Sequence, residues 1–167
     1  MRQKQLAVIG STGSIGVQTL DIISEYPQLF RAAVLVGGSN VDLLEKQAMT
    51  HRPEKVVIAD ERGYSRLRDS LTPLGITVET GSKAVAEAAI SLPGIDTAVI
   101  ATVGYSGLEP TLKAIEHNKD IALANKETLV VAGELVTSRL AKSKSALMPI
   151  DSEHSAIYQS LVGESHD

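Results

Sequence analysis

The stretch Gly10-Ser11-Thr12-Gly13-Ser14-Ile15-Gly16 decides the fold that the sequence predicts. It follows a short apolar run at 6–9, and it opens a segment at 15–25 with the pattern of a helix. A strand, a glycine-rich turn and a helix are typical of dinucleotide-binding folds, because glycines let backbone N–H groups approach a pyrophosphate at the helix N-terminus. The glycine spacing is G-x-x-G-x-x-G, so a tight turn that binds nothing is the alternative. A P-loop is excluded, because Ile15 and Gly16 stand where that motif needs Gly-Lys.

Apolar runs like the one before this turn recur along the chain and predict buried strands. None alternates polar with apolar residues, which indicates strands covered on both faces, as in a parallel sheet. The runs lie at 6–9, 32–36, 56–59, 98–101, 121–124 and 146–150, and helical patterns separate them at 15–25, 41–51, 61–71, 82–91, 108–117 and 127–142. We therefore predict an α/β fold, a doubly wound parallel sheet of Rossmann type with strand order 3-2-1-4-5-6. A weakly alternating segment at 76–79 is a candidate extra strand.

Composition excludes several classes of protein. The chain has 167 residues, a net charge of −4 and no basic cluster, so we expect no nucleic-acid partner. It has no cysteine, which excludes disulfides, thiolate metal sites and dehydrogenases that use a catalytic cysteine. No apolar run approaches the roughly 20 residues of a membrane span. Without a targeting signal in the sequence, we expect a cytoplasmic protein with no membrane partner.

The end of the second predicted strand indicates which dinucleotide would bind. NAD sites usually carry an acidic residue there, which bonds the ribose 2′-OH. Here the strand ends in Gly37-Gly38-Ser39-Asn40, which holds no carboxylate. Ser39 and Asn40 are able to donate hydrogen bonds to a 2′-phosphate, so the sequence favours NADP over NAD. The alternative is that Asn40 only caps the following helix.

A second polar motif, Ala124-Asn125-Lys126-Glu127, closes the fifth predicted strand. Ligands of open α/β sheets bind beyond the carboxyl ends of the strands. Asn125 and Glu127 also suit a helix start, but Lys126 opposes the helix dipole there. We therefore expect Lys126 to bind a phosphate or carbonyl of a substrate, with a solvated lysine as the alternative.

The character of the chain changes after Pro149, where the polar motif Asp151-Ser152-Glu153-His154 begins. In an extended segment the two carboxylates point to one side, which suits Mg²⁺ or Mn²⁺. Apolar residues at helical spacing follow. We predict a dinucleotide-binding domain at 1–150 and, at 151–167, the beginning of a second domain whose remainder the sequence lacks.

Together the three motifs closely resemble the 1-deoxy-D-xylulose 5-phosphate reductoisomerase family over essentially the whole chain. The resemblance implies an NADPH-dependent and metal-dependent reductoisomerase that converts 1-deoxy-D-xylulose 5-phosphate to 2-C-methyl-D-erythritol 4-phosphate in non-mevalonate isoprenoid biosynthesis. It implies NADPH, Mg²⁺ or Mn²⁺ (with Co²⁺ as a further candidate), a sugar-phosphate substrate and a homodimer.

The resemblance also assigns roles to residues of this chain. The implied cofactor-binding residues are Thr12, Gly13, Ser14, Ile15, Gly38, Ser39, Asn40, Asn125 and Glu127. Asp151 and Glu153 would hold the metal; Lys126, Ser152 and Glu153 would bind substrate, and Lys126 and Glu153 are the implied catalytic residues. Some relatives carry a basic residue in place of Ser39. The family's third carboxylate ligand lies beyond Asp167, so the 167-residue chain is expected to be inactive alone.

The sequence leaves three other functions to compare with this one. A short-chain dehydrogenase needs Tyr-x-x-x-Lys, and no tyrosine of the chain has a lysine at that offset. Another NADP-dependent oxidoreductase or a free-standing NADP-binding module would explain the glycine turn. The module would leave the Asp151-Ser152-Glu153 motif without a purpose.

Overall fold

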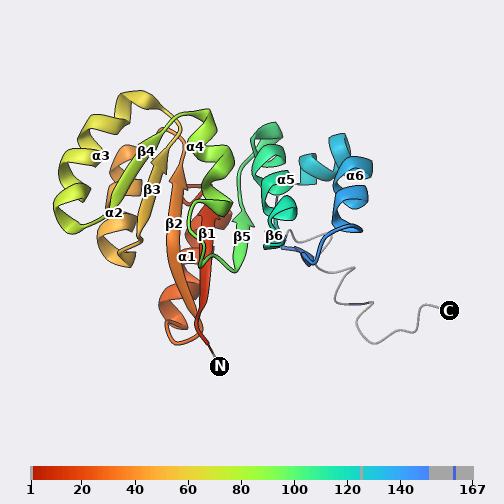
Figure 1. The fold of residues 1–167 in the computed structure, drawn as a ribbon. Coiled ribbons are helices and arrows are strands. Elements are labelled where there is room, and N and C mark those ends of the chain that lie inside the picture. The colour runs from red at the N-terminus through yellow and green to blue at the C-terminus, as the bar shows by residue number, and fades with distance from the viewer. Residues whose placement is uncertain (1, 125, 151–159, 161–167) are drawn as a thin grey trace.

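The computed structural model describes residues 2–124, 126–150 and 160, and for residue 126 it describes the backbone alone. One parallel sheet of seven strands runs through the molecule in the order β4-β3-β2-β1-β5-β6-β7 (Figure 1). The strands are β1 (Lys4–Ile9), β2 (Phe30–Gly37), β3 (Lys55–Ile58), β4 (Thr77–Thr80), β5 (Thr97–Ile100), β6 (Asp120–Leu123) and β7 (Leu147–Pro149). The predicted α/β fold is confirmed. The predicted strand order holds, and the candidate extra strand joins the sheet as β4, at its edge.

Helices cover both faces of the sheet. On one face lie α1 (Ser14–Glu25), α2 (Val41–His51) and α3 (Tyr64–Leu71), and on the other α4 (Ser82–Glu87), α5 (Leu108–Glu116) and α6 (Lys126–Leu140). Successive strand residues alternate between the two cores, as the pleat of a strand requires. In β1, Leu6 and Val8 pack with α1, α2 and α3, whereas Ala7 and Ile9 pack with α5 and α6. The inner strands are therefore buried on both sides, which explains the continuous apolar runs.

Two predicted helices differ from the observed ones. The segment 61–71 begins as a short 3-10 helix, η1 (Glu61–Gly63), before α3, because the Asp60 side chain accepts a hydrogen bond from the Arg62 backbone N–H at 3.1 Å. The segment 82–91 ends in the 3-10 helix η3 (Ala88–Ile90), a common way for a helix to tighten at its end. Two further 3-10 helices are η2 (Thr72–Leu74) and η4 (Gly104–Gly107). No helix of the described residues is long and apolar enough to span a membrane.

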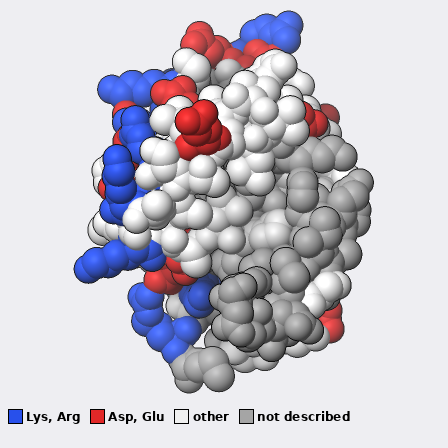
Figure 2. Space-filling model, turned by 90° about the vertical axis from the view of Figure 1, so that its right-hand side faces the viewer, with Lys and Arg blue, Asp and Glu red and all other residues white. Residues whose placement is uncertain are grey.

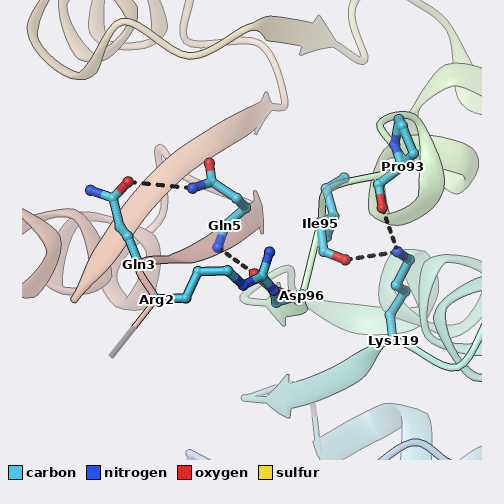
Figure 3. Close-up of polar contacts among 7 residues, drawn as sticks. All are labelled: Arg2, Gln3, Gln5, Pro93, Ile95, Asp96 and Lys119. Atoms are coloured by element: carbon cyan, nitrogen blue, oxygen red, sulfur yellow. Dashed lines mark hydrogen bonds and ion pairs between the residues drawn. The ribbon is translucent and has the colours of Figure 1, made fainter. Parts of the chain in front are cut away.

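The amino-terminal edge of the sheet is held by side chains that bind one another and the backbone (Figure 3). Asp96 pairs with Arg2 and accepts a hydrogen bond from the Gln5 backbone N–H at 2.8 Å. The ammonium group of Lys119 donates to the carbonyl of Ile95 at 2.7 Å and to that of Pro93 at 3.2 Å. These contacts tie the starts of β1, β5 and β6 together. The opposite edge, where the strands end, carries the glycine-rich turn instead.

Candidate functional site

The glycine-rich turn lies where the sheet changes direction. β1 has β2 on one side and β5 on the other, with Ile9 level with Val36 and with Ile100. The connection after β1 runs over the face that carries α1, whereas α5, which follows β5, covers the opposite face. At such a switch point a crevice opens beyond the carboxyl ends of the strands, and ligands of doubly wound sheets bind there.

Backbone contacts hold the turn against the neighbouring strands. The N–H groups of Gly10 and Ser11 both donate to the Val36 carbonyl, at 2.9 and 2.8 Å. Gly10 has a φ of +92°, and a Cβ there would lie 2.6 Å from the Ala101 carbonyl oxygen. A Cβ on Gly16 would lie 2.2 Å from the Gly10 carbonyl oxygen. These two glycines are therefore required by the packing of the turn itself.

Gly13 is different, because packing does not require a glycine there. A Cβ on Gly13 would meet its nearest neighbours, the carbonyl oxygens of Gly10 and Ala101, at 3.4 and 3.6 Å. Gly13 is exposed and forms the N-cap of α1, with no side chain capping the helix and no acidic residue in the first turn. The first N–H groups of a helix have no intrahelical acceptor, and the dipole adds partial positive charge. This end of α1 thus suits an anion such as a phosphate.

The neighbouring predicted residues surround this helix end. Ser14 is exposed, and Thr12 and Ile15 are half-buried. Ile15 lines an apolar cavity together with Val99, Ala122 and Ile150. The cavity brings the glycine turn near Ile150, the residue directly before the predicted metal motif.

The second predicted group, Gly38, Ser39 and Asn40, is exposed at the end of β2. The Asn40 side chain caps α2 by accepting a hydrogen bond from the Leu43 N–H at 3.1 Å, so its role as an N-cap is confirmed. This bond uses the Asn40 carbonyl oxygen and leaves the amide as a donor. A role for these three residues in 2′-phosphate binding stays a prediction.

Sequence reasoning missed a carboxylate beside this group. The Asp60 N–H donates to the Gly38 carbonyl at 3.1 Å, so Asp60, which follows β3, lies beside the end of β2. Arg62 binds the Asp60 carboxylate at 2.6 Å, and its hydrogen bonds lower the pKa of Asp60 to about 2. The pair is therefore fully ionised at neutral pH and carries no net charge. The pairing of β2 with β3 creates this neighbourhood, which a linear motif does not reveal.

The third predicted group lies at the same edge of the sheet. The Ala124 N–H donates to the Ile100 carbonyl at 2.9 Å, and α6 begins at Lys126 with Glu127 in its first turn. The Ile150 N–H donates to the Leu123 carbonyl at 3.0 Å, which brings the chain back to this edge. Asn125, the Lys126 side chain and the predicted metal and substrate residues Asp151, Ser152 and Glu153 lie outside the described residues.

Exposed apolar side chains that the sequence analysis did not select adjoin the site. Val103 and Tyr105, just after β5, are 85% and 71% exposed. Val130, Val131 and Leu135 of α6 are also exposed. In Figure 2, most of the Lys and Arg side chains on this side of the molecule lie along the left margin. The position of Val103 and Tyr105, soon after the apolar run of β5 and so at the carboxyl end of a strand, was the sequence signal that could have identified them.

Comparison with known proteins identifies the family. Residues 6–133 match the family model of 1-deoxy-D-xylulose 5-phosphate reductoisomerase. The chain belongs to this reductoisomerase family. The reductoisomerase of Porphyromonas gingivalis (strain W83) is 54% identical over 162 residues, which are 97% of this chain and 42% of that protein. The reductoisomerase of Chlorobaculum tepidum is 49% identical over 160 residues, 96% of this chain and 42% of that protein. The chain thus spans about 42% of the length of these relatives.

Solved reductoisomerase structures share the fold. The Zymomonas mobilis enzyme in complex with NADPH superposes with a TM-score of 0.89 at 37% identity, over 95% of this chain and 42% of that one. A reductoisomerase in complex with NADPH, fosmidomycin and magnesium superposes with a TM-score of 0.88 at 41% identity, over 93% of this chain and 38% of that one. The resemblance read from the three sequence motifs is confirmed at the level of the family.

Proposed function

We propose that this chain supplies the NADPH-binding part of a 1-deoxy-D-xylulose 5-phosphate reductoisomerase. Residues 1–150 would form the cofactor domain and 151–167 would begin the catalytic domain. One observation carries the proposal: an uncapped helix N-terminus without acidic residues lies at the switch point of the sheet, beside the glycine turn. The NADPH bound in solved relatives supports the choice of cofactor.

The two ends of the cofactor would bind at two helix starts. Thr12, Gly13, Ser14 and Ile15 would line the pyrophosphate and its ribose at the start of α1. Gly38, Ser39 and Asn40 would face the adenosine 2′-phosphate at the start of α2, and the Asp60–Arg62 pair beside them adds no net charge. Glu127 and Asn125 would contact the cofactor from the end of β6.

The remaining motifs would serve the substrate. Asp151 and Glu153 are hard oxygen donors that suit Mg²⁺ or Mn²⁺, and solved relatives hold magnesium. A divalent cation stabilises negative charge that develops on substrate oxygens. Lys126 and Ser152 would orient the sugar phosphate, and NADPH would supply the hydride. From the family resemblance we also propose that the full-length protein is a cytoplasmic homodimer. Light scattering of the full-length protein tests the dimer.

The proposal is tested with a chimera in which this chain replaces the matching 162 residues of the Porphyromonas gingivalis reductoisomerase. The chimera is expected to oxidise NADPH with 1-deoxy-D-xylulose 5-phosphate, and EDTA is expected to abolish the reaction. Asp151→Ala or Glu153→Ala should each remove the activity, because each would leave the cation with one carboxylate from this motif. Glu164→Ala, a nearby acid outside the motif, is the control and should stay active.

The 167-residue chain alone is expected to show no turnover. Mg²⁺ gives up its bound waters reluctantly, so a site with only two carboxylates binds it weakly. Turnover by the chain alone, or full activity of the chimera with Asp151→Ala, contradicts the assignment of metal ligands.

Lys126 gives a separate prediction. In the chimera, Lys126→Ala is expected to lower kcat with the fold intact, because a substrate-binding cation is lost. A positive charge in the first turn of α6 opposes the helix dipole, so the melting temperature should stay the same or rise slightly. Steady-state kinetics and thermal unfolding check both results, and Lys142→Ala, beyond the other end of α6, is the control. An unchanged kcat returns Lys126 to the role of a solvated lysine.

A further inference from the structure

Gln47 connects α2 to the glycine turn. The residue is 7% exposed, and its Nε2 atom donates a hydrogen bond to the Ser11 carbonyl at 2.8 Å. Ser11 is fully buried. The Ser11 N–H is already bound to Val36, so the residue is held through both of its backbone groups. The contact spans 36 positions of the sequence, and no local motif requires it.

The amide satisfies the buried Ser11 carbonyl, but other polar atoms of this pair remain unsatisfied. The Ser11 hydroxyl oxygen and the Gln47 Oε1 atom are both buried without a hydrogen-bond partner among the described residues. Buried polar atoms that lack a partner are destabilising and need another explanation. A methionine would bury a similar volume and remove the unpaired Oε1 atom, but it would leave the Ser11 carbonyl without this donor. The amide therefore both pairs a buried carbonyl and holds the Ser11 peptide in one orientation.

The hydrogen bond fixes the direction of the next N–H group. The peptide unit between Ser11 and Thr12 is planar and trans, so its N–H points opposite to its C=O. Because Gln47 binds the carbonyl, the Thr12 N–H is directed away from α2. The same helix begins at Val41, directly after its N-cap Asn40, which belongs to the predicted 2′-phosphate group. One rigid element thus contacts both ends of the predicted cofactor site.

We propose that Gln47 is a positioning residue for the dinucleotide: it orients the Ser11–Thr12 peptide so that the Thr12 N–H faces the pyrophosphate. The inference rests on the proposed function, because it assumes that the turn binds NADPH. It adds that the phosphate geometry is set from α2, by a side chain that does not contact the cofactor.

The test is Gln47→Met in the 167-residue chain, with two ligands that divide the site. NADPH needs the glycine turn, whereas adenosine 2′-monophosphate has no pyrophosphate and needs only the start of α2. NADPH affinity is expected to fall by about tenfold, the equivalent of one hydrogen bond to a charged group. Affinity for adenosine 2′-monophosphate, followed by NMR, should stay the same. The melting temperature is expected to fall modestly, because the buried Ser11 carbonyl loses its donor.

Lys119→Met is the matched control, because it removes a side-chain tether to the backbone at the opposite edge of the sheet (Figure 3). It is expected to lower the melting temperature and leave NADPH affinity unchanged. Gln47→Asn is the second variant, since its amide is one methylene too short to reach Ser11, and it should reproduce the loss of NADPH affinity.

The outcomes separate the inference from the proposed function. If the wild-type chain does not bind NADPH, the proposed function fails and this inference with it. If the wild type binds and Gln47→Met binds equally well, the inference alone is overturned. A parallel loss of both ligands, or failure of both Gln47 variants to fold, would assign Gln47 a purely structural role and also overturn it.

Discussion

Gly16→Ala is expected to destabilise the fold severely. The new Cβ would lie 2.2 Å from the Gly10 carbonyl oxygen and 2.6 Å from the Ser11 Cα, and both are backbone atoms. They cannot move freely, because the N–H groups of Gly10 and Ser11 are bound to Val36. Relief of the clash therefore breaks the anchor of the turn. We expect the free energy of unfolding to fall by about 4 kcal/mol, a large share of a domain's typical stability, as measured by urea unfolding.

Gly94→Ala is the control for this substitution. No heavy atom lies within 4 Å of a Cβ at Gly94. Its expected effect is within about 0.5 kcal/mol, as for ordinary surface positions. A Gly16→Ala chain as stable as the Gly94→Ala chain would show that the turn is not packed as described.

Gly13→Val is expected to abolish NADPH binding while the fold persists. The backbone of Gly13 is extended, with φ −81° and ψ 170°, which a β-branched residue adopts readily. Its Cβ would make only ordinary contacts with the protein. The side chain would instead project at the start of α1, where the pyrophosphate would lie. We expect NADPH affinity to fall by at least about a hundredfold, and calorimetric titration measures it.

Two further measurements make this result interpretable. Thermal unfolding of Gly13→Val should match the wild type, which separates it from Gly16→Ala in the same turn. Adenosine 2′-monophosphate should still bind at the start of α2. Wild-type affinity of the Gly13→Val chain for NADPH would place the pyrophosphate elsewhere.

The fold was predictable because its signals are local. Each buried parallel strand reads as a continuous apolar run, and the helical segments between the runs require parallel crossovers. β4 was the weakest signal, because this edge strand keeps Thr77 exposed and Glu79 and Thr80 half-buried, so its sequence alternates. The glycine turn and the capping role of Asn40 also depend on neighbours in the chain.

The contacts that sequence reasoning missed depend on distant segments. Asp60 lies beside Gly38 only because β3 pairs with β2, with Ile58 opposite Gly37. Gln47 reaches Ser11 only because α2 packs over the start of the turn. Neither neighbourhood has a linear pattern. The absence of a carboxylate at the end of β2 was read correctly, but the charge at that place is set by Asp60 and Arg62 together.

The most direct test of the account is a titration of the 167-residue chain with NADPH and with NADH. The predicted site offers a 2′-phosphate the donors of Ser39 and Asn40 and the start of α2, while Arg62 neutralises the carboxylate of Asp60. We expect NADPH to bind at least about tenfold more tightly than NADH, the equivalent of one hydrogen bond to a charged group. Equal affinities, a preference for NADH, or no binding of either nucleotide would contradict the assignment of this chain as an NADPH-binding domain.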